Sequence, residues 1–129
     1  MARKITKLSN TRQFGFCYER RACRYLQRQG LALLQRNFQC RYGEIDLVLQ
    51  DPSGFVVFAE IRYRRSREFG GAAASVDWRK QQRLRRSAAC FLNQFPTLAH
   101  HPCRFDVIAM QPDGVAGEPS IDWIKQAFT

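Results

Sequence analysis

The spacing of apolar residues predicts two amphipathic helices. Residues 13–29 place apolar side chains on one arc of a helix and arginines on the opposite arc, and Gly30 is a suitable stop. Residues 75–93 show the same period, with Ser75 as the expected cap. The arc expected to be buried in this second helix consists of Trp78, Leu84, Ala88, Ala89, Phe91 and Leu92.

The remaining apolar segments have the pattern of β-strands. Strands are expected over residues 31–41, 44–49, 55–63, 103–110 and 121–124. In the second of these, Ile45, Leu47 and Leu49 alternate and are expected to share one face. The third strand is apolar on both faces over its first five residues, which favours a central position in the sheet.

The predicted order α-β-β-β-α-β-β is typical of an α/β fold in which helices flank a mixed sheet. The chain has 129 residues, of which 45% are hydrophobic, and this suits one domain over residues 1–129. Residues 1–12 are expected to form a flexible arm. The longest strictly apolar run, Phe55 to Ala59, is far too short to span a membrane.

The cysteines and the first residues of the chain favour a cytoplasmic protein. The five cysteines contain no C-x-x-C pair, so neither a zinc site nor a disulfide scaffold is expected. The basic residues near Met1 are followed by no apolar segment of the kind found in a signal peptide.

Positive charge is concentrated in one quarter of the chain. The sequence has 21 Lys and Arg residues against 11 Asp and Glu, a net charge of +10. Arginine dominates the cluster, and its planar set of donors suits phosphate oxygens. The favoured partner is therefore a nucleic acid, with DNA favoured over RNA, although a solvated basic face would look the same. The candidate contacts are Arg64, Arg65, Arg67, Arg79, Lys80, Arg83 and Arg86.

Three acidic residues lie where acids are unusual. Glu19 falls inside the apolar arc of the first helix, so it requires a salt bridge, a proton or a bound cation. Asp46 and Glu60 lie on consecutive strands that could bring them to one face, and Arg62 follows Glu60 by two residues. Two such carboxylates need a compensating cation, and Mg²⁺ or Mn²⁺ suits oxygen donors. The ordinary alternatives are a salt bridge at the edge of the helix for Glu19 and a cross-strand salt bridge at the sheet edge for Glu60 and Arg62.

Several motifs together carry a resemblance to a known family. In these motifs the chain resembles the YraN-type family of small bacterial proteins. That family is similar to archaeal Holliday-junction resolvases and is placed in the PD-(D/E)xK, or restriction-endonuclease-like, superfamily. The motifs are Gly15-x-x-x-Glu19 with Ala22 and Tyr25-Leu26, Arg36-Asn37, Gly43 to Val48, Ala59 to Arg62, Val76 with Lys80 and Arg83-Leu84, Arg104 to Ile108, and Trp123-Ile124 with Ala127-Phe128.

The resemblance implies a restriction-endonuclease-like fold and a divalent-metal site. Asp46 and Glu60 would bind Mg²⁺ or Mn²⁺, and Glu19 would be a third ligand or support them. One position departs from the superfamily motif, because Arg62 stands where a lysine is expected and, unlike lysine, it cannot lose its proton. Lys80 could supply the missing ammonium.

Two functions therefore stay open from the sequence. One is a metal-dependent endonuclease acting on structured DNA, with Asp46, Glu60, Arg62 and Glu19 in the catalytic site. The other is a non-catalytic protein of the same fold that binds nucleic acid or serves as a scaffold. A homodimer is one possible assembly.

Overall fold

The computed structural model describes the backbone of residues 10–63, 76–112 and 119–129, with side chains from residue 18 onward in these ranges. The elements follow one another as helix α2 (Asn10–Arg28), strands β1 (Ala32–Cys40), β2 (Gly43–Gln50) and β3 (Val56–Tyr63), helix α3 (Trp78–Gln94), the short 3-10 helix η2 (Pro96–His100), and strands β4 (Cys103–Gln111) and β5 (Ser120–Phe128). The predicted α/β class and element order are confirmed.

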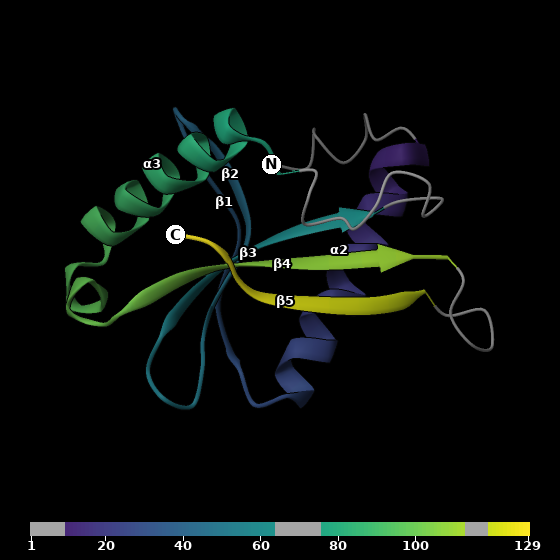
Figure 1. The fold of residues 1–129 in the computed structure, drawn as a ribbon, viewed down its shortest axis with the longest axis horizontal. Coiled ribbons are helices and arrows are strands. Elements are labelled where there is room, and N and C mark those ends of the chain that lie inside the picture. The colour runs from purple at the N-terminus through teal and green to yellow at the C-terminus, as the bar shows by residue number, and fades with distance from the viewer. Residues whose placement is uncertain (1–9, 64–75, 113–118) are drawn as a thin grey trace.

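The strands form a five-stranded sheet in the order β1-β2-β3-β4-β5 (Figure 1). Strand β3 lies at its centre, as its apolar sequence predicts, and pairs in parallel with β4, while the other neighbours are antiparallel. The parallel pair needs a crossover, which α3 provides. The chain therefore forms a mixed sheet.

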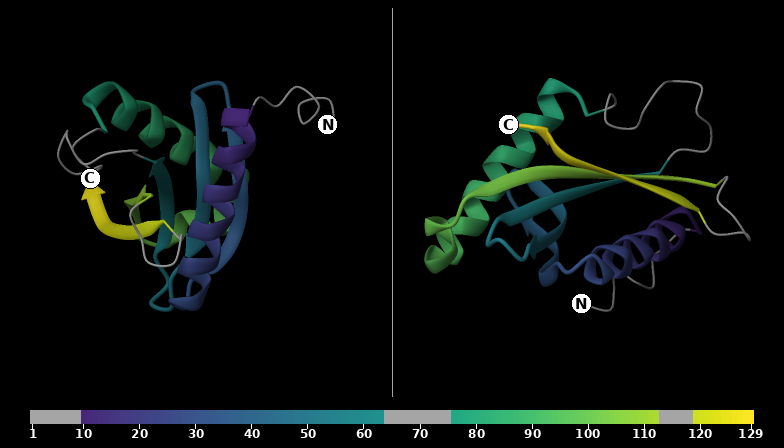
Figure 2. Two further views of the ribbon diagram at one scale, coloured as in Figure 1. Left: turned by 90° about the vertical axis from the view of Figure 1, so that its right-hand side faces the viewer. Right: turned by 60° about the horizontal axis from the view of Figure 1, so that its bottom comes forward.

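The two helices cover opposite faces of this sheet (Figure 2). Helix α2 packs Ala22, Cys23 and Leu26 against one face, and α3 packs Leu84, Ala88 and Phe91 against the other. Neither helix is both long enough and apolar enough to cross a membrane, within the residues described. Because β3 contributes buried side chains to both clusters, the core extends through the sheet.

The start of α3 differs from the prediction. Its cap is Asp77, whose Oδ1 accepts a hydrogen bond from the Lys80 backbone N–H at 2.8 Å, whereas Ser75 lies outside the described residues. Trp78 was expected in the buried arc, but 70% of it is exposed. Trp78 and Ala89 are about three helical turns apart and so point to the same side of α3, away from the side that buries Leu84 and Phe91. Ala89 is exposed as well, and Ser87 is buried instead.

Two boundaries also differ. Helix α2 begins at Asn10, three residues before the expected start, so the predicted flexible arm falls mainly on residues outside the description. Strand β5 extends to Phe128, well beyond the predicted end at Ile124. It continues past polar residues because Gln126 adopts a left-handed conformation (φ 50°), which returns Phe128 to a stacked contact with Phe105.

The alternation predicted for β2 fails at one residue. Leu47 and Leu49 pack on the α2 face as expected, but Ile45 packs on the α3 face, in the cluster that holds Val48. Strand β2 therefore twists between Ile45 and Leu47, a change that a period of two does not anticipate.

A buried carboxylate joins β4 to β5. Asp106 is 1% exposed, and its oxygens accept hydrogen bonds from Arg104 Nε at 3.0 Å, Trp123 Nε1 at 2.9 Å and the Gln126 backbone N–H at 2.9 Å. Arg104 also donates to Asp51 Oδ2 at 2.7 Å, and Asp51 organises the turn between β2 and β3. This arrangement gives the Arg104-to-Ile108 motif a structural role.

We expect Asp106→Ala to destabilise the protein by about 3 kcal/mol or more, because it leaves the buried Arg104 guanidinium with one carboxylate partner and removes the acceptor of two other donors. Urea unfolding monitored by circular dichroism measures the change. Asp122→Ala, an exposed acid on β5, is the matched control and should shift stability by less than about 0.5 kcal/mol. Equal effects of the two substitutions would contradict this account.

Candidate functional site

The candidate site lies where two neighbouring strands separate. Strand β2 pairs with β1 as far as Gly43, but its pairing with β3 ends at Leu47 and Ala59. Asp46 and Glu60 are the next residues on their strands, so they face each other at the point of divergence. The Ile61 backbone N–H, which lies beyond the β2–β3 pairing, donates to Asp46 Oδ2 at 2.8 Å. The two predicted carboxylates are therefore brought together.

Glu60 is an acid at a core position of the central strand. It is only 5% exposed, and an unpaired charge at such a depth is costly. Two cations approach the same oxygen, Oε2: Lys80 Nζ at 3.3 Å and Arg62 Nη1 at 3.4 Å. Lys80 comes from α3, across the cleft between helix and strand. The helix therefore places an ammonium beside Glu60, as the sequence suggested it could.

Glu19 joins the site through a residue that the sequence analysis did not select. Asn37 has a left-handed backbone (φ 51°), a conformation that asparagine tolerates better than most residues, and it lies opposite Asp46 on β1. With its amide nitrogen facing the acids, Asn37 donates to Glu19 Oε1 at 3.1 Å and to Glu44 Oε2 at 2.9 Å. Asn37 and Glu44 both belong to the family motifs, which was the available signal.

The electrostatics of the site show an excess of negative charge. Burial raises the pKa of Asp46 well above its usual range, and the charge of Glu60 raises it further, against the opposing hydrogen bond from Ile61. The pKa of Glu19 is raised by burial and then by the charge of Glu44. The protein thus holds several carboxylates where their ionised forms repel one another. A bound cation would relieve this repulsion.

The donor set suits one kind of metal better than another. Among the described residues no three His, Cys, Asp or Glu side chains form a cluster that could ligate a single ion, so there is no closed protein cage. Mg²⁺ and Mn²⁺ are typically held by one or two carboxylates together with water and phosphate oxygens. Asp46 and Glu60 fit this pattern. Glu19 is tied to Asn37 and Glu44, which favours the supporting role over that of a third ligand.

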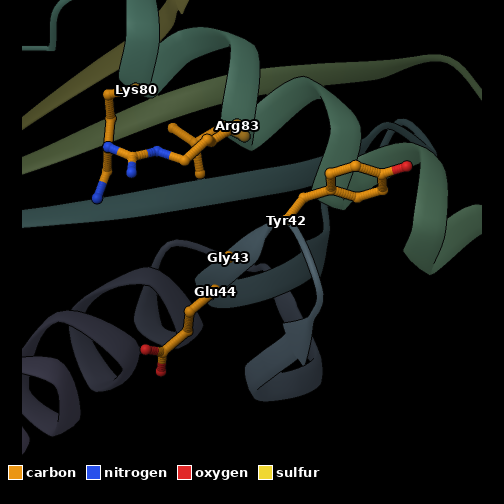
Figure 3. A pocket seen from close by; sticks show the side chains of 6 residues that line it. Tyr42, Gly43, Glu44, Lys80 and Arg83 are labelled. Atoms are coloured by element: carbon orange, nitrogen blue, oxygen red, sulfur yellow. The ribbon is translucent and has the colours of Figure 1, made fainter.

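The basic residues of α3 border the site. A pocket of about 190 Å³ separates Lys80 and Arg83 on α3 from Glu44 on β2 (Figure 3). Arg79, Arg83 and Arg86 are exposed on the helix, and the Arg86 guanidinium lies 5.8 Å from the centre of the Tyr42 ring. The other predicted contacts, Arg64, Arg65 and Arg67, lie outside the described residues.

Comparison with known proteins identifies relatives that span nearly the whole chain. The model of the family described as "Uncharacterised protein family UPF0102" matches residues 18–110. A UPF0102 protein of Pseudomonas putida (strain GB-1) is 51% identical over 114 residues, which cover 88% of this chain and 91% of that protein. A UPF0102 protein of Pseudomonas paraeruginosa (strain DSM 24068 / PA7) is 48% identical over 124 residues, covering 96% and 98% respectively.

The raised pKa of Asp46 has a consequence for stability. The folded protein binds a proton at Asp46 more tightly than the unfolded chain does, so this contribution is fully present below the unfolded pKa of about 4 and is lost as pH rises through the folded pKa. Asp46→Asn imitates the protonated form and can retain the bond from Ile61. We expect the variant to be measurably more stable than the natural protein at pH 7.

The expected difference shrinks as pH falls toward 4. Urea unfolding at several pH values measures it, and Asp122→Asn, which changes an exposed acid on β5, serves as the control. A variant at Asp46 that is less stable at neutral pH would show that the carboxylate is stabilised by its surroundings.

Proposed function

The chain belongs to the uncharacterised protein family UPF0102, the YraN-type family that its motifs resemble, and from the site described above we propose that it is a divalent-metal-dependent endonuclease acting on structured DNA. The observation that carries the proposal is the meeting of Asp46 and Glu60 where β2 and β3 diverge, with the Lys80 ammonium on Glu60. The fold and the residue types agree with the restriction-endonuclease-like superfamily that the motifs suggest.

Asp46 and Glu60 are the proposed ligands of Mg²⁺ or Mn²⁺. The metal, when bound, would polarise a phosphodiester and acidify a water. Lys80 and Arg62 bring two positive charges to the edge of this pair, where they can neutralise charge that develops on a phosphate. A guanidinium group does not act as a base, whereas a lysine amine can, so Lys80 is the group able to take the role of the missing strand lysine.

The surroundings of the site suit a polyanion. Lys80 and Arg83 extend from α3 beside the pocket, and Arg79 is exposed on the same helix, so a phosphate backbone that followed α3 would pass these cations. Trp78 exposes most of its ring in the first turn of the same helix. Exposed aromatic rings beside arginines are suited to stacking with unpaired bases, which favours DNA with unpaired or branched segments over a regular duplex.

A second function has an observation in its favour. Glu60 Oε2 is already paired with both Lys80 and Arg62, and these cations could compensate the carboxylate without a metal. The same surface would then bind nucleic acid without cleaving it. In both proposals the protein acts in the cytoplasm, and a homodimer stays a prediction.

We expect the purified protein to cleave branched or single-strand-containing DNA in the presence of Mn²⁺ or Mg²⁺, and Asp46→Asn to lower the rate by about a hundredfold or more. This variant is informative because it is expected to fold at least as stably as the natural protein. Gel assays on labelled junctions, flaps and duplexes measure cleavage. Asp122→Asn should cleave normally.

Metal binding can be followed without cleavage. Mn²⁺ should raise the melting temperature of the natural protein and of Asp122→Asn but not that of Asp46→Asn. Binding of junction DNA without cleavage or Mn²⁺ stabilisation would favour the non-catalytic function. Absence of DNA binding as well would reject both proposals.

Salt dependence tests the basic face. Plots of the logarithm of DNA affinity against that of salt concentration should be steep, and Arg83→Ala should reduce the slope by about one unit. Arg28→Ala removes an exposed arginine from α2, on the opposite face of the sheet, and should leave the slope unchanged. If the two substitutions have equal effects, the α3 surface is not the binding face.

A further inference from the structure

Two thiols meet beside the pocket, where the β1–β2 hairpin touches α3. Cys40 is the last residue of β1, and its Sγ lies 3.5 Å from Ser87 Oγ on α3. Cys90 is one helical turn after Ser87 and therefore on the same side of the helix. The thiols of Cys40 and Cys90 lie close enough to change each other's pKa. Both residues are half-buried, so they are accessible to small molecules.

The packing of the hairpin end fixes this contact. Gly43 pairs with Cys40 across the turn and has a positive φ of 143°, which most other residues would not adopt. A side chain there would begin 3.8 Å from Ser87 Oγ, so hairpin and helix are in close approach. Cys40 is thus held against the turn of α3 that carries both Ser87 and Cys90.

The two thiols have different chemical environments. Burial alone would raise the pKa of Cys40, but hydrogen bonds with the Ser87 side chain, with the Cys90 thiol and with the Tyr42 and Gly43 backbone bring the pKa below its usual value. Burial and the neighbouring Cys40 instead raise the pKa of Cys90. A thiol of lowered pKa beside one of raised pKa is the arrangement expected of an attacking and a resolving cysteine.

The other cysteines whose side chains are described lie elsewhere. Cys23 is 1% exposed in the cluster under α2, on the opposite face of the sheet. Cys103 is exposed at the start of β4. They provide internal standards for a buried thiol and for an exposed thiol in the same molecule.

We propose that Cys40 and Cys90 form a reversible disulfide, with a hydroperoxide as the oxidant. The Cys40 thiolate attacks one peroxide oxygen, an S–O bond forms as the O–O bond breaks, and the leaving oxygen takes up a proton. The sulfur of Cys90 then attacks the sulfur of Cys40, the S–O bond breaks, and the hydroxyl group of the sulfenic acid leaves as water with the Cys90 proton. With hydrogen peroxide, two thiols are oxidised and one peroxide is reduced to two waters. An added dithiol restores both cysteines by exchange.

The disulfide would act on the pocket beside it. Tyr42 and Glu44 follow Cys40 in the hairpin, and Lys80 and Arg83 precede Cys90 on α3, and these four residues line the two sides of the pocket (Figure 3). A covalent link between the hairpin and α3 beside the pocket would hold its two sides together. The proposal stands independently of the nuclease function, because it concerns only the thiols.

The test uses the full chain, reduced and folded, with equimolar hydrogen peroxide, followed by alkylation, digestion and mass spectrometry. The expected product is a peptide pair joined through Cys40 and Cys90, lighter by two hydrogen atoms and released by dithiothreitol. Cys23 and Cys103 should remain as thiols. Cross-linking of Cys40 to any other cysteine, or oxidation of Cys103 before the pair, would overturn the proposal.

Single substitutions test the two roles. In Cys90→Ser, Cys40 should accumulate as a sulfenic acid that dimedone traps, whereas the natural protein should give no adduct. In Cys40→Ser, Cys90 should react with peroxide about tenfold more slowly. Cys103→Ser should form the disulfide as the natural protein does, and circular dichroism verifies that each variant is folded. Equal reactivity of Cys40 and Cys90 in the single variants would contradict the assignment.

Discussion

The charge of Glu60 at the centre of the sheet constrains much of the structure around it. Strand β3 is buried on both faces from Val56 onward, and Glu60 continues this run as a carboxylate that is 5% exposed. Such a group requires compensation from whatever packs against the strand. Lys80 supplies it from α3 and Arg62 from β3 itself, so the register of helix on sheet and the chemistry of the site are determined together.

The position of Glu60 also explains why strands β2 and β3 separate. If β2 continued to pair with β3 beyond Leu47 and Ala59, Asp46 and Glu60 would be neighbours in a closed ladder with no room between them. The twist in β2 that carries Ile45 to the α3 face separates the strands here. The Ile61 N–H then bonds to the carboxylate of Asp46 in place of a strand partner. An acidic pair with an accessible face is the result.

The pattern of apolar and polar residues was sufficient to predict most of the helices and strands, because this pattern follows from which side of each element is buried. The apolar run of β3 indicated a central strand, and the helical period of α2 and α3 indicated their buried sides. Trp78 was predicted to be buried because the expected arc was wider than the side of α3 that packs on the sheet, which is centred on Leu84 and Phe91. The length of β5 and the roles of Asn37 and Glu44 depend on left-handed backbone at Gln126 and Asn37, which no alternation of residue types reveals.

In the candidate site, too, the spacing of residues along the sequence predicts some features and misses others. Asp46 and Glu60 were predictable because adjacent strands bring cross-strand residues to one face. The superfamily motif has a lysine two residues after the second acid, and this chain has Arg62 at that position. The electrostatic effect of an ammonium group on a phosphate or a carboxylate depends, however, on the distance between them and not on their spacing in the sequence. Lys80 on α3 places its Nζ 3.3 Å from Glu60 Oε2. The cation beside Glu60 can come from β3 itself or from α3, which packs on the sheet. A motif defined along one strand detects only a cation on that strand.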